Sequence, residues 1–154
     1  MKRVTIVVFV FSLIGCLFCY ADTVSYDERL AVIYIQTNAV VKIGAHMSSI
    51  ICTLGEPQLV KNDNSGNLVL SWPNGLLVYC DKDGRIEKIT IWTNSYKTIN
   101  GLTVGDSRKK AKQVLGTYDE WKDWISCDII YGAWVMQIKM KDDLIAEIHI
   151  SRDS

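Results

Sequence analysis

The chain has 154 residues, of which 17 are Lys or Arg and 17 are Asp or Glu, so its formal net charge is zero. This balance argues against nucleic-acid binding, because a nucleic-acid-binding domain needs a basic surface. The length fits one domain or two very small ones.

The first 21 residues are predicted to be a signal peptide. Lys2 and Arg3 precede a continuous apolar run over residues 4–21, which is the order of a basic region and an apolar region in such peptides. Cleavage after Ala21 would release a chain that begins at Asp22. We therefore expect an exported protein that is periplasmic, envelope-anchored or secreted.

Two other interpretations of the same segment stay open. Residues 13–16 read LIGC and resemble a bacterial lipobox, in which case Cys16 would become a lipidated N-terminus. Alternatively the run is an uncleaved membrane anchor, although about 18 apolar residues are at the short end for crossing a bilayer. Contact with a membrane is expected only through such an N-terminal anchor.

Residues 22–38 are predicted to form an N-terminal strand. The segment DERLAVIYIQTN, residues 27–38, is rich in β-branched residues and partly alternates between apolar and polar positions, which is typical of strands. Similar segments recur as DGRIEKITIWTN at 83–94 and DDLIAEIHISRD at 142–153. Three strands of related pattern are therefore expected.

A longer phrase also occurs twice, as VVKIGAHMSSIICTLG at 40–55 and GLTVGDSRKKAKQVLG at 101–116. Each predicts a short helix that ends at its last glycine, Gly55 or Gly116. Asp106 or Ser107 should cap the second helix, and Ser48 is a weaker capping candidate at the first. Helices of about ten residues are too short to be stable alone, so each must pack on a sheet.

Predicted hairpins follow both helices. NLVLSW at 67–72 and LLVYCD at 76–81 flank a Pro-Asn-Gly turn, and residues 125–131 and 134–140 form the second pair. We therefore predict an α+β fold of two tandem repeats, each a short helical motif packed on a three-stranded antiparallel β-meander. Repeat unit 1 would span residues 39–94 and repeat unit 2 residues 95–154.

This pattern resembles the β-lactamase-inhibitor-protein fold and is similar to the BamE (SmpA/OmlA) outer-membrane-assembly lipoproteins, which carry one such unit. The resemblance covers roughly residues 29–151 and rests on glycine spacing and turn residues. It implies units without catalytic activity or cofactor that grip another protein. The chain differs from the inhibitors because it lacks a cysteine pair within each repeat.

No segment carries a clear catalytic or metal-binding signature. DKDG at 81–84 contains part of a calcium loop but runs directly into a strand, so a hairpin turn is favoured. His46 and His149 are interpreted as structural or solvent-facing, although a Cys–His or Ser–His nucleophile pair stays open. RKKAK at 108–112 is either a solvated helix face or a contact for an acidic partner or anionic lipid headgroups.

Three cysteines follow residue 21, namely Cys52, Cys80 and Cys127. They form no CxxC motif, so neither a zinc site nor a redox pair is indicated. We predict no disulfide between them, because alternation places Cys80 and Cys127 on opposite faces of the sheet, and Cys52 on a helix flank.

Strand alternation also predicts a binding surface. If the recurrent isoleucines face the helices, the residues between them point to the opposite, helix-free face of the sheet. The apolar residues expected on that face then indicate a surface that binds a partner. A register error, or burial by the N-terminal strand and the 56–66 loop, is the alternative interpretation. Aromatic residues are the usual interface anchors, and the predicted contact residues are Tyr34, Leu76, Val78, Trp92, Trp121 and Trp124.

The sequence therefore predicts an exported, non-enzymatic protein-binding module that grips a partner protein through the helix-free sheet face. One alternative is an envelope-anchored assembly or scaffolding lipoprotein. Another is a small ligand-binding protein or hydrolase, which would require a concave pocket with perturbed histidine or carboxylate groups.

Overall fold

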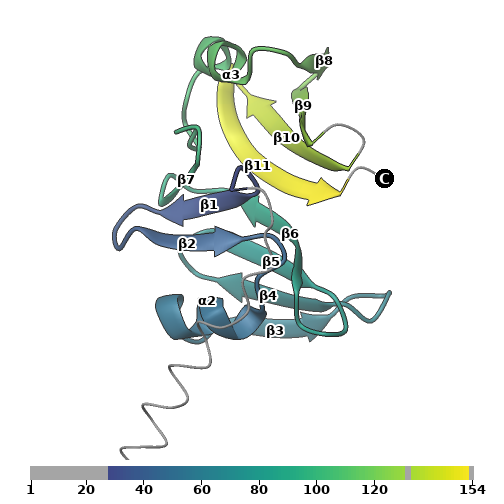
Figure 1. Cartoon of the computed structure of the whole chain (residues 1–154). Helices are drawn as coiled ribbons and strands as arrows, with labels where there is room; N and C mark the ends of the chain where they lie inside the picture. The colour runs from purple at the N-terminus through teal and green to yellow at the C-terminus, as the bar shows by residue number, and fades with distance from the viewer. Residues whose placement is uncertain (1–27, 131–132, 153–154) are drawn as a thin grey trace, which may run out of the picture.

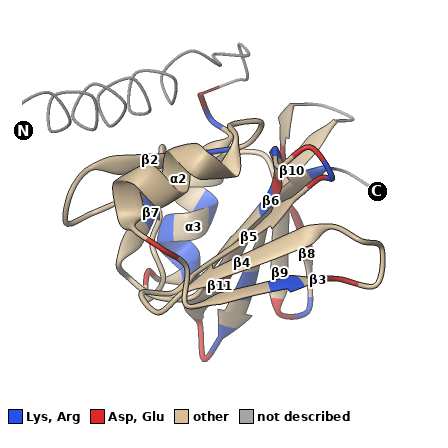
Figure 2. Cartoon of the chain, turned by 90° about the horizontal axis from the view of Figure 1, so that it is seen from below, with Lys and Arg blue, Asp and Glu red and all other residues tan. Residues whose placement is uncertain are grey.

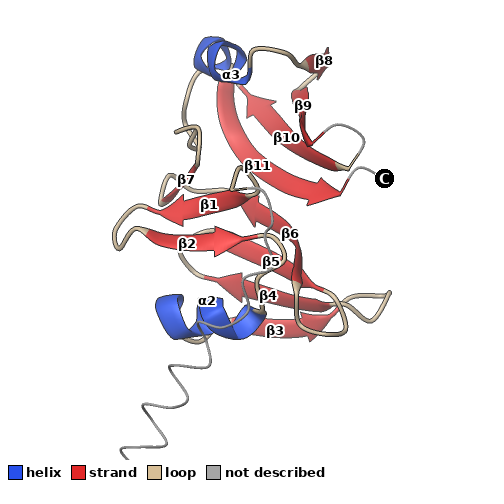
Figure 3. Cartoon of the chain, in the orientation of Figure 1, coloured by secondary structure: helices blue, strands red, loops and turns tan. Residues whose placement is uncertain are grey.

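The computed structural model describes residues 28–130 and 133–152. The predicted signal peptide and Cys16 lie outside the described residues. Strands make up about half of the described chain, and its helices are α2 (Met47–Leu54) and α3 (Arg108–Leu115) (Figure 3). Within these residues no helix is both long and apolar enough to span a membrane.

Eight strands form one large antiparallel sheet (Figure 1). Their order across the sheet is β3-β4-β5-β6-β11-β10-β9-β8, so the four strands that follow α2 occupy one half and the four that follow α3 occupy the other. The strands are β3 (Leu59–Asn62), β4 (Leu68–Trp72), β5 (Leu76–Cys80), β6 (Ile86–Ile91), β8 (Asp119–Trp121), β9 (Trp124–Ile130), β10 (Trp134–Lys141) and β11 (Leu144–Arg152).

A second sheet of three strands has the order β2-β1-β7. It consists of β1 (Ala31–Tyr34), β2 (Ala39–Lys42) and β7 (Tyr96–Thr98). This small sheet and the two helices lie on one side of the large sheet (Figure 2). One hydrophobic core, which includes residues of the small sheet, both helices and both halves of the large sheet, fills the space between these layers.

The predicted fold class is wrong. The described chain is mostly β, and it is organised as two sheets rather than as two separate repeats of a helix on a three-stranded meander. The strands of both halves merge because β6 pairs with β11, with Ile89 opposite Ile150 and Ile91 opposite Ile148. A meander that ended at β6 or at β11 would leave the backbone N–H and C=O groups of that edge strand unpaired. The pairing of β6 with β11 supplies hydrogen-bond partners to both strands.

The small sheet follows from the shortness of the helices. Two eight-residue helices are each about 12 Å long at 1.5 Å per residue, which is too little to cover eight strands spaced about 4.8 Å apart. The β1–β2 hairpin and β7 therefore bury the rest of the inner face, with Val32 and Val41 fully buried. The sequence prediction of a lone N-terminal strand missed this layer.

The helix starts are capped by side chains. Ser107 Oγ accepts a hydrogen bond from the Lys110 amide at 3.2 Å, as the sequence predicts for the second helix. At the first helix the cap is His46, whose Nδ1 accepts from the Ser48 amide at 3.3 Å. Ser48 contributes by contacting the same ring nitrogen through its hydroxyl at 2.8 Å.

Both helices end at the predicted glycines. Gly55 and Gly116 have φ values of 81° and 71°, and their amides donate to Ile51 and Lys112 respectively. Such positive φ values favour glycine. The carbonyl of Gly55 also accepts a hydrogen bond of 2.9 Å from the buried indole of Trp72, which fixes the end of α2 against β4.

The start of each helix is tied to the strand that closes the same half of the sheet. The Gly44 amide donates to the Ile86 carbonyl of β6 at 2.8 Å, and the Gly105 amide donates to the Ile145 carbonyl of β11 at 2.9 Å. These two equivalent hydrogen bonds give a structural reason for the repeated phrase, since each copy ties its helix to the strand at which its half of the sheet meets the other half.

The DKDG segment is a turn, as predicted. Asp81 Oδ1 accepts hydrogen bonds from the amides of Asp83 at 2.9 Å and Arg85 at 2.8 Å. Gly84 has φ +76°, and an added Cβ would lie 2.7 Å from His46 Nε2. The turn therefore requires glycine for two reasons, its backbone angle and the proximity of the histidine that caps α2.

The structure joins no pair of the three cysteines in a disulfide, but the predicted reason is wrong. Cys80 and Cys127 both belong to the side of the sheet that faces the core. They lie on β5 and β9, which are separated by three intervening strands, so about 19 Å of sheet stands between them at 4.8 Å per strand. A disulfide needs Cβ atoms within about 4.5 Å.

We predict that Leu76→Ala will destabilise the protein by about 2–5 kcal/mol, the usual cost of truncating a buried leucine. Leu76 is 0% exposed, whereas its neighbour Leu77 points to the opposite face and is half-buried. Leu77→Ala is the matched control and should cost less than half as much. Equal losses in chemical denaturation would contradict the register of β5.

We predict that a thiol reagent at pH 8 modifies Cys52 in the folded protein and reaches Cys80 only after unfolding. Cys52 is exposed, whereas burial raises the pKa of the Cys80 thiol to about 12, which leaves almost no reactive thiolate. Mass spectrometry of the modified peptides measures both sites. Rapid modification of Cys80 in the native protein would show that β5 is not in the core.

Candidate functional site

The face of the large sheet that points away from the helices is the candidate site. Residues that are opposite each other in antiparallel strands point to the same side, and successive residues alternate. Because Ile89 and Ile91 point into the core, their neighbours Lys88, Thr90 and Trp92 point outward. We call this surface the helix-free face. Together with the residues that point to the same side in the neighbouring strands, it consists of Leu77, Tyr79, Lys88, Thr90, Trp92, Glu147, His149, Gln137, Lys139, Trp124, Ser126, Asp119 and Trp121.

Two of the predicted contact residues do not lie on this face. Leu76 pairs with Ile91 and Val78 pairs with Ile89, so both point into the core, where they are 0% exposed. The prediction was out of register by one residue on β5. The adjacent Leu77 and Tyr79 occupy the helix-free face instead.

Tyr34 is also misplaced by the sequence prediction. It ends β1 of the small sheet, so it does not belong to the large sheet at all. Its ring lies 5.1 Å from that of Tyr96 between centroids, and its hydroxyl donates to Gln36 Oε1 at 2.6 Å. This tyrosine packs on the core, and its assignment to the binding surface is withdrawn.

Three of the five tryptophans lie on the helix-free face. Trp92 is 41% exposed and Trp121 is 69% exposed, while Trp124 is half-buried and opposes Trp121 in the β8–β9 hairpin. The other two, Trp72 and Trp134, are buried. Large exposed aromatic side chains are uncommon on a surface that contacts only water.

The helix-free face carries an outer hollow of about 360 Å³. It lies over β8, β9 and β10 and is lined by Asp119, Trp121, Trp124, Ser126 and Gln137. The Lys122 ammonium is 4.9 Å from the centre of the Trp121 ring, a distance at which a cation is attracted to an aromatic face.

A central hollow of about 520 Å³ lies over the junction of β6 and β11. Its walls combine apolar and aromatic side chains with four polar or charged ones. Of these residues only Trp92 is among the contact residues predicted from the sequence. The lining residues are Leu77, Tyr79, Lys88, Thr90, Trp92, Ala146, Glu147 and His149.

A chain of polar contacts crosses the central hollow. Thr90 Oγ1 lies 3.0 Å from His149 Nδ1, and His149 Nε2 lies 3.1 Å from Glu147 Oε2. The Lys139 ammonium donates to Glu147 Oε1 at 2.9 Å. The Trp124 ring lies beside the imidazole of His149, with 5.5 Å between the ring centres and an angle of 45° between the ring planes.

The electrostatics of this chain keep His149 neutral near pH 7. Burial lowers the pKa of His149, and the nearby charge of Lys88 lowers it further, while Glu147 acts in the opposite direction. The pKa of Glu147 is itself lowered, mainly by the hydrogen bond from Lys139. The hollow therefore holds a carboxylate that is already bound by two donors.

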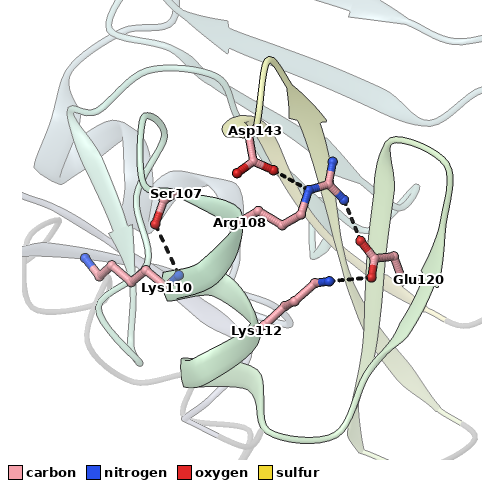
Figure 4. A network of polar contacts seen from close by, with 6 residues as sticks. All are labelled: Ser107, Arg108, Lys110, Lys112, Glu120 and Asp143. Atoms are coloured by element: carbon pink, nitrogen blue, oxygen red, sulfur yellow. Dashed lines mark hydrogen bonds and ion pairs between the residues drawn. The ribbon is translucent and has the colours of Figure 1, made fainter.

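Two members of the basic cluster on α3, Arg108 and Lys112, are engaged within the protein (Figure 4). Arg108 donates to Glu120 Oε1 at 2.5 Å and to Asp143 Oδ1 at 2.7 Å, and Lys112 contacts Glu120 Oε2 at 2.6 Å. The hydrogen bond from Lys112 and then that from Arg108 lower the pKa of Glu120. Glu120 points inward from β8, so the network holds the strand whose outward neighbour is Trp121.

Within residues 28–130 and 133–152, no cluster of three or more His, Cys, Asp or Glu side chains could hold a metal ion. His46 is used as a helix cap, and His149 has one carboxylate neighbour in the polar chain.

No family model and no curated protein matches the sequence. Among solved structures, the chain is similar to an extracellular protein containing a SCP domain from Bacillus anthracis str. Ames, with 9% sequence identity and a TM-score of 0.49. The match covers 86% of this chain and 49% of that chain, so this chain spans about half the length of the matched structure. A likeness of this size assigns neither a family nor an activity. The resemblance to the inhibitor and BamE-type proteins stays a prediction.

We predict that the protein loses stability between pH 7.5 and 5.5 and that His149→Gln reduces this loss. The pKa of His149 is lowered in the folded state, so the unfolded chain takes up this proton more readily, and stability falls as the pH drops below about 6.5. Chemical denaturation at several pH values measures the effect. An unchanged pH dependence in His149→Gln would show that the imidazole titrates normally.

Proposed function

We propose that this chain is an exported, non-enzymatic protein that binds a partner protein through its helix-free face. The observation that carries the proposal is the exposure of Trp92 and Trp121 at two hollows of the same sheet face. Aromatic side chains next to a hollow are typical anchors of protein interfaces, because they bury a large area at a small entropic cost. The proposal keeps the predicted face but replaces Leu76 and Val78 by Leu77 and Tyr79.

A second candidate is a small hydrolase acting at the central hollow. The order hydroxyl, imidazole and carboxylate in Thr90, His149 and Glu147 is the order used in nucleophilic catalysis. We favour binding because Thr90 is only 6% exposed, which limits access of a substrate carbonyl to its hydroxyl. Glu147 is also shared with Lys139, which weakens its support of the imidazole.

Export is part of the proposal and rests on the basic and apolar pattern of residues 2–21. The envelope-anchored alternative differs in one covalent feature, an acylated Cys16. Mass spectrometry of the N-terminal peptide from cells that produce the protein distinguishes the two, because cleavage after Ala21 would leave Asp22 as the first residue.

We predict that a photo-crosslinking amino acid at Trp92 or at Trp121 joins the protein to one and the same partner in the cells that produce it. The matched control is Val40, which is apolar and 53% exposed but belongs to the small sheet. Because it lies away from the helix-free face, a crosslinker there should give no such product. Gel shifts followed by peptide mass spectrometry identify the products.

The proposal fails if Val40 gives the same product as the two tryptophan positions, or if Trp92 and Trp121 give none. Esterase assays on the same preparation address the second candidate. Turnover of an activated ester that is lost in Thr90→Val would favour the hydrolase.

A further inference from the structure

The central hollow carries a positive charge that the protein does not neutralise by direct contact. Lys88 and Lys139 are cationic and Glu147 is anionic, and the carboxylate of Glu147 is occupied by Lys139 and His149. The Lys88 ammonium lies 5.3 Å from the centre of the Tyr79 ring. Within the part of the chain that the structure describes, no ion pair joins Lys88 to a carboxylate.

Apolar or aromatic side chains flank Lys88 on the β5 side of the hollow and at the end of β6, whereas Thr90, Glu147 and His149 form its polar side. Leu77 and Tyr79 come from β5, and Trp92 is 41% exposed at the end of β6. Low-polarity walls strengthen the attraction between a lysine and an incoming carboxylate, because less water screens the two charges. They also provide area for an apolar side chain beside that carboxylate.

From this arrangement we propose that the central hollow takes an acidic side chain of the partner protein together with an adjacent apolar side chain, and that Lys88 selects the carboxylate. This inference rests on the proposed function and adds the chemistry of the partner to it. An amide or a cation at the same place would leave the Lys88 charge uncompensated.

The same geometry links binding to pH. The titratable and charged groups facing His149 are Lys88 on β6, Glu147 on β11 and Lys139 on β10, with Tyr79 of β5 beside Lys88. A bound carboxylate offsets the positive charge of Lys88, which is one of the causes that disfavour the imidazolium. Binding therefore favours proton uptake by His149, so affinity for the acidic group rises as the pH falls from 7.5 to 5.5.

The test uses two capped dipeptides as probes, N-acetyl-Asp-Phe-amide and N-acetyl-Asn-Phe-amide, which differ by one charge. Titration of the whole exported protein is followed by the NMR signal of the Trp92 indole, assigned with Trp92→Phe. We expect the Asp peptide to bind about three- to fivefold more tightly than the Asn peptide, the range for a partly solvated ion pair.

Lys88→Met should abolish this preference, whereas Lys61→Met should retain it. Lys61 is an exposed lysine on the edge strand β3, three positions from β6 in the sheet order. The preference should increase at pH 5.5 in the natural protein and stay constant in His149→Gln.

Equal affinities for the two peptides would overturn the proposal, as would a preference that survives Lys88→Met or the absence of any Trp92 response. A crosslinked partner at Trp92 and Trp121 could still be found in each of these cases, so failure of the charge assignment is distinguishable from failure of the binding face.

Discussion

The pairing of β6 with β11 is the constraint on which the rest of the structure depends. On the inner side it aligns four buried isoleucines, with Ile89 opposite Ile150 and Ile91 opposite Ile148. The same register places Thr90 directly opposite His149 on the outer side. One set of backbone hydrogen bonds therefore builds both the middle of the core and the floor of the central hollow. A slip of one residue would exchange the two faces and destroy both.

Local features of the sequence were sufficient to predict most of the elements. The ends of both helices follow from Gly55 and Gly116, because a positive φ at a helix end favours glycine whatever the tertiary context. The hairpin strands follow from their turn residues. The short edge strand β3 falls in the predicted 56–66 loop, and β8 was not predicted as a strand, because segments of four and three residues are too short to show a periodicity. The predicted fold class was wrong because neither the sequence of β6 nor that of β11 indicates that the two strands pair with each other.

The predicted contact residues lie on the helix-free face in part, and the errors have two causes. Tyr34 belongs to the small sheet, which the sequence did not predict, and the second error is one of register. Trp92, Trp121 and Trp124 were assigned to the helix-free face, where they lie. The assignment failed on β5, whose sequence LLVYC is apolar at every position, so alternation could not indicate which residues point inward. Lys88 was not grouped with Glu147 and His149, because β6 and β11 are brought together only by their pairing in the large sheet. The contacts among these residues therefore depend on strand pairing and are not marked by a local sequence motif.

The two edges of the large sheet are held differently, and the difference follows from the composition of the helices. α3 carries Arg108 and Lys112, which bind Glu120 and so fix β8 beneath the helix. α2 has the sequence MSSIICTL and contains no charged residue, so its side chains form no ion pair with the sheet. All four residues of β3 are exposed. For the proposed binding role of this face, a rigid aromatic anchor is an advantage, because less conformational freedom is lost on binding. The edge that carries Trp121 is the one held by ion pairs, and this places the better-organised half of the helix-free face at β8 and β9.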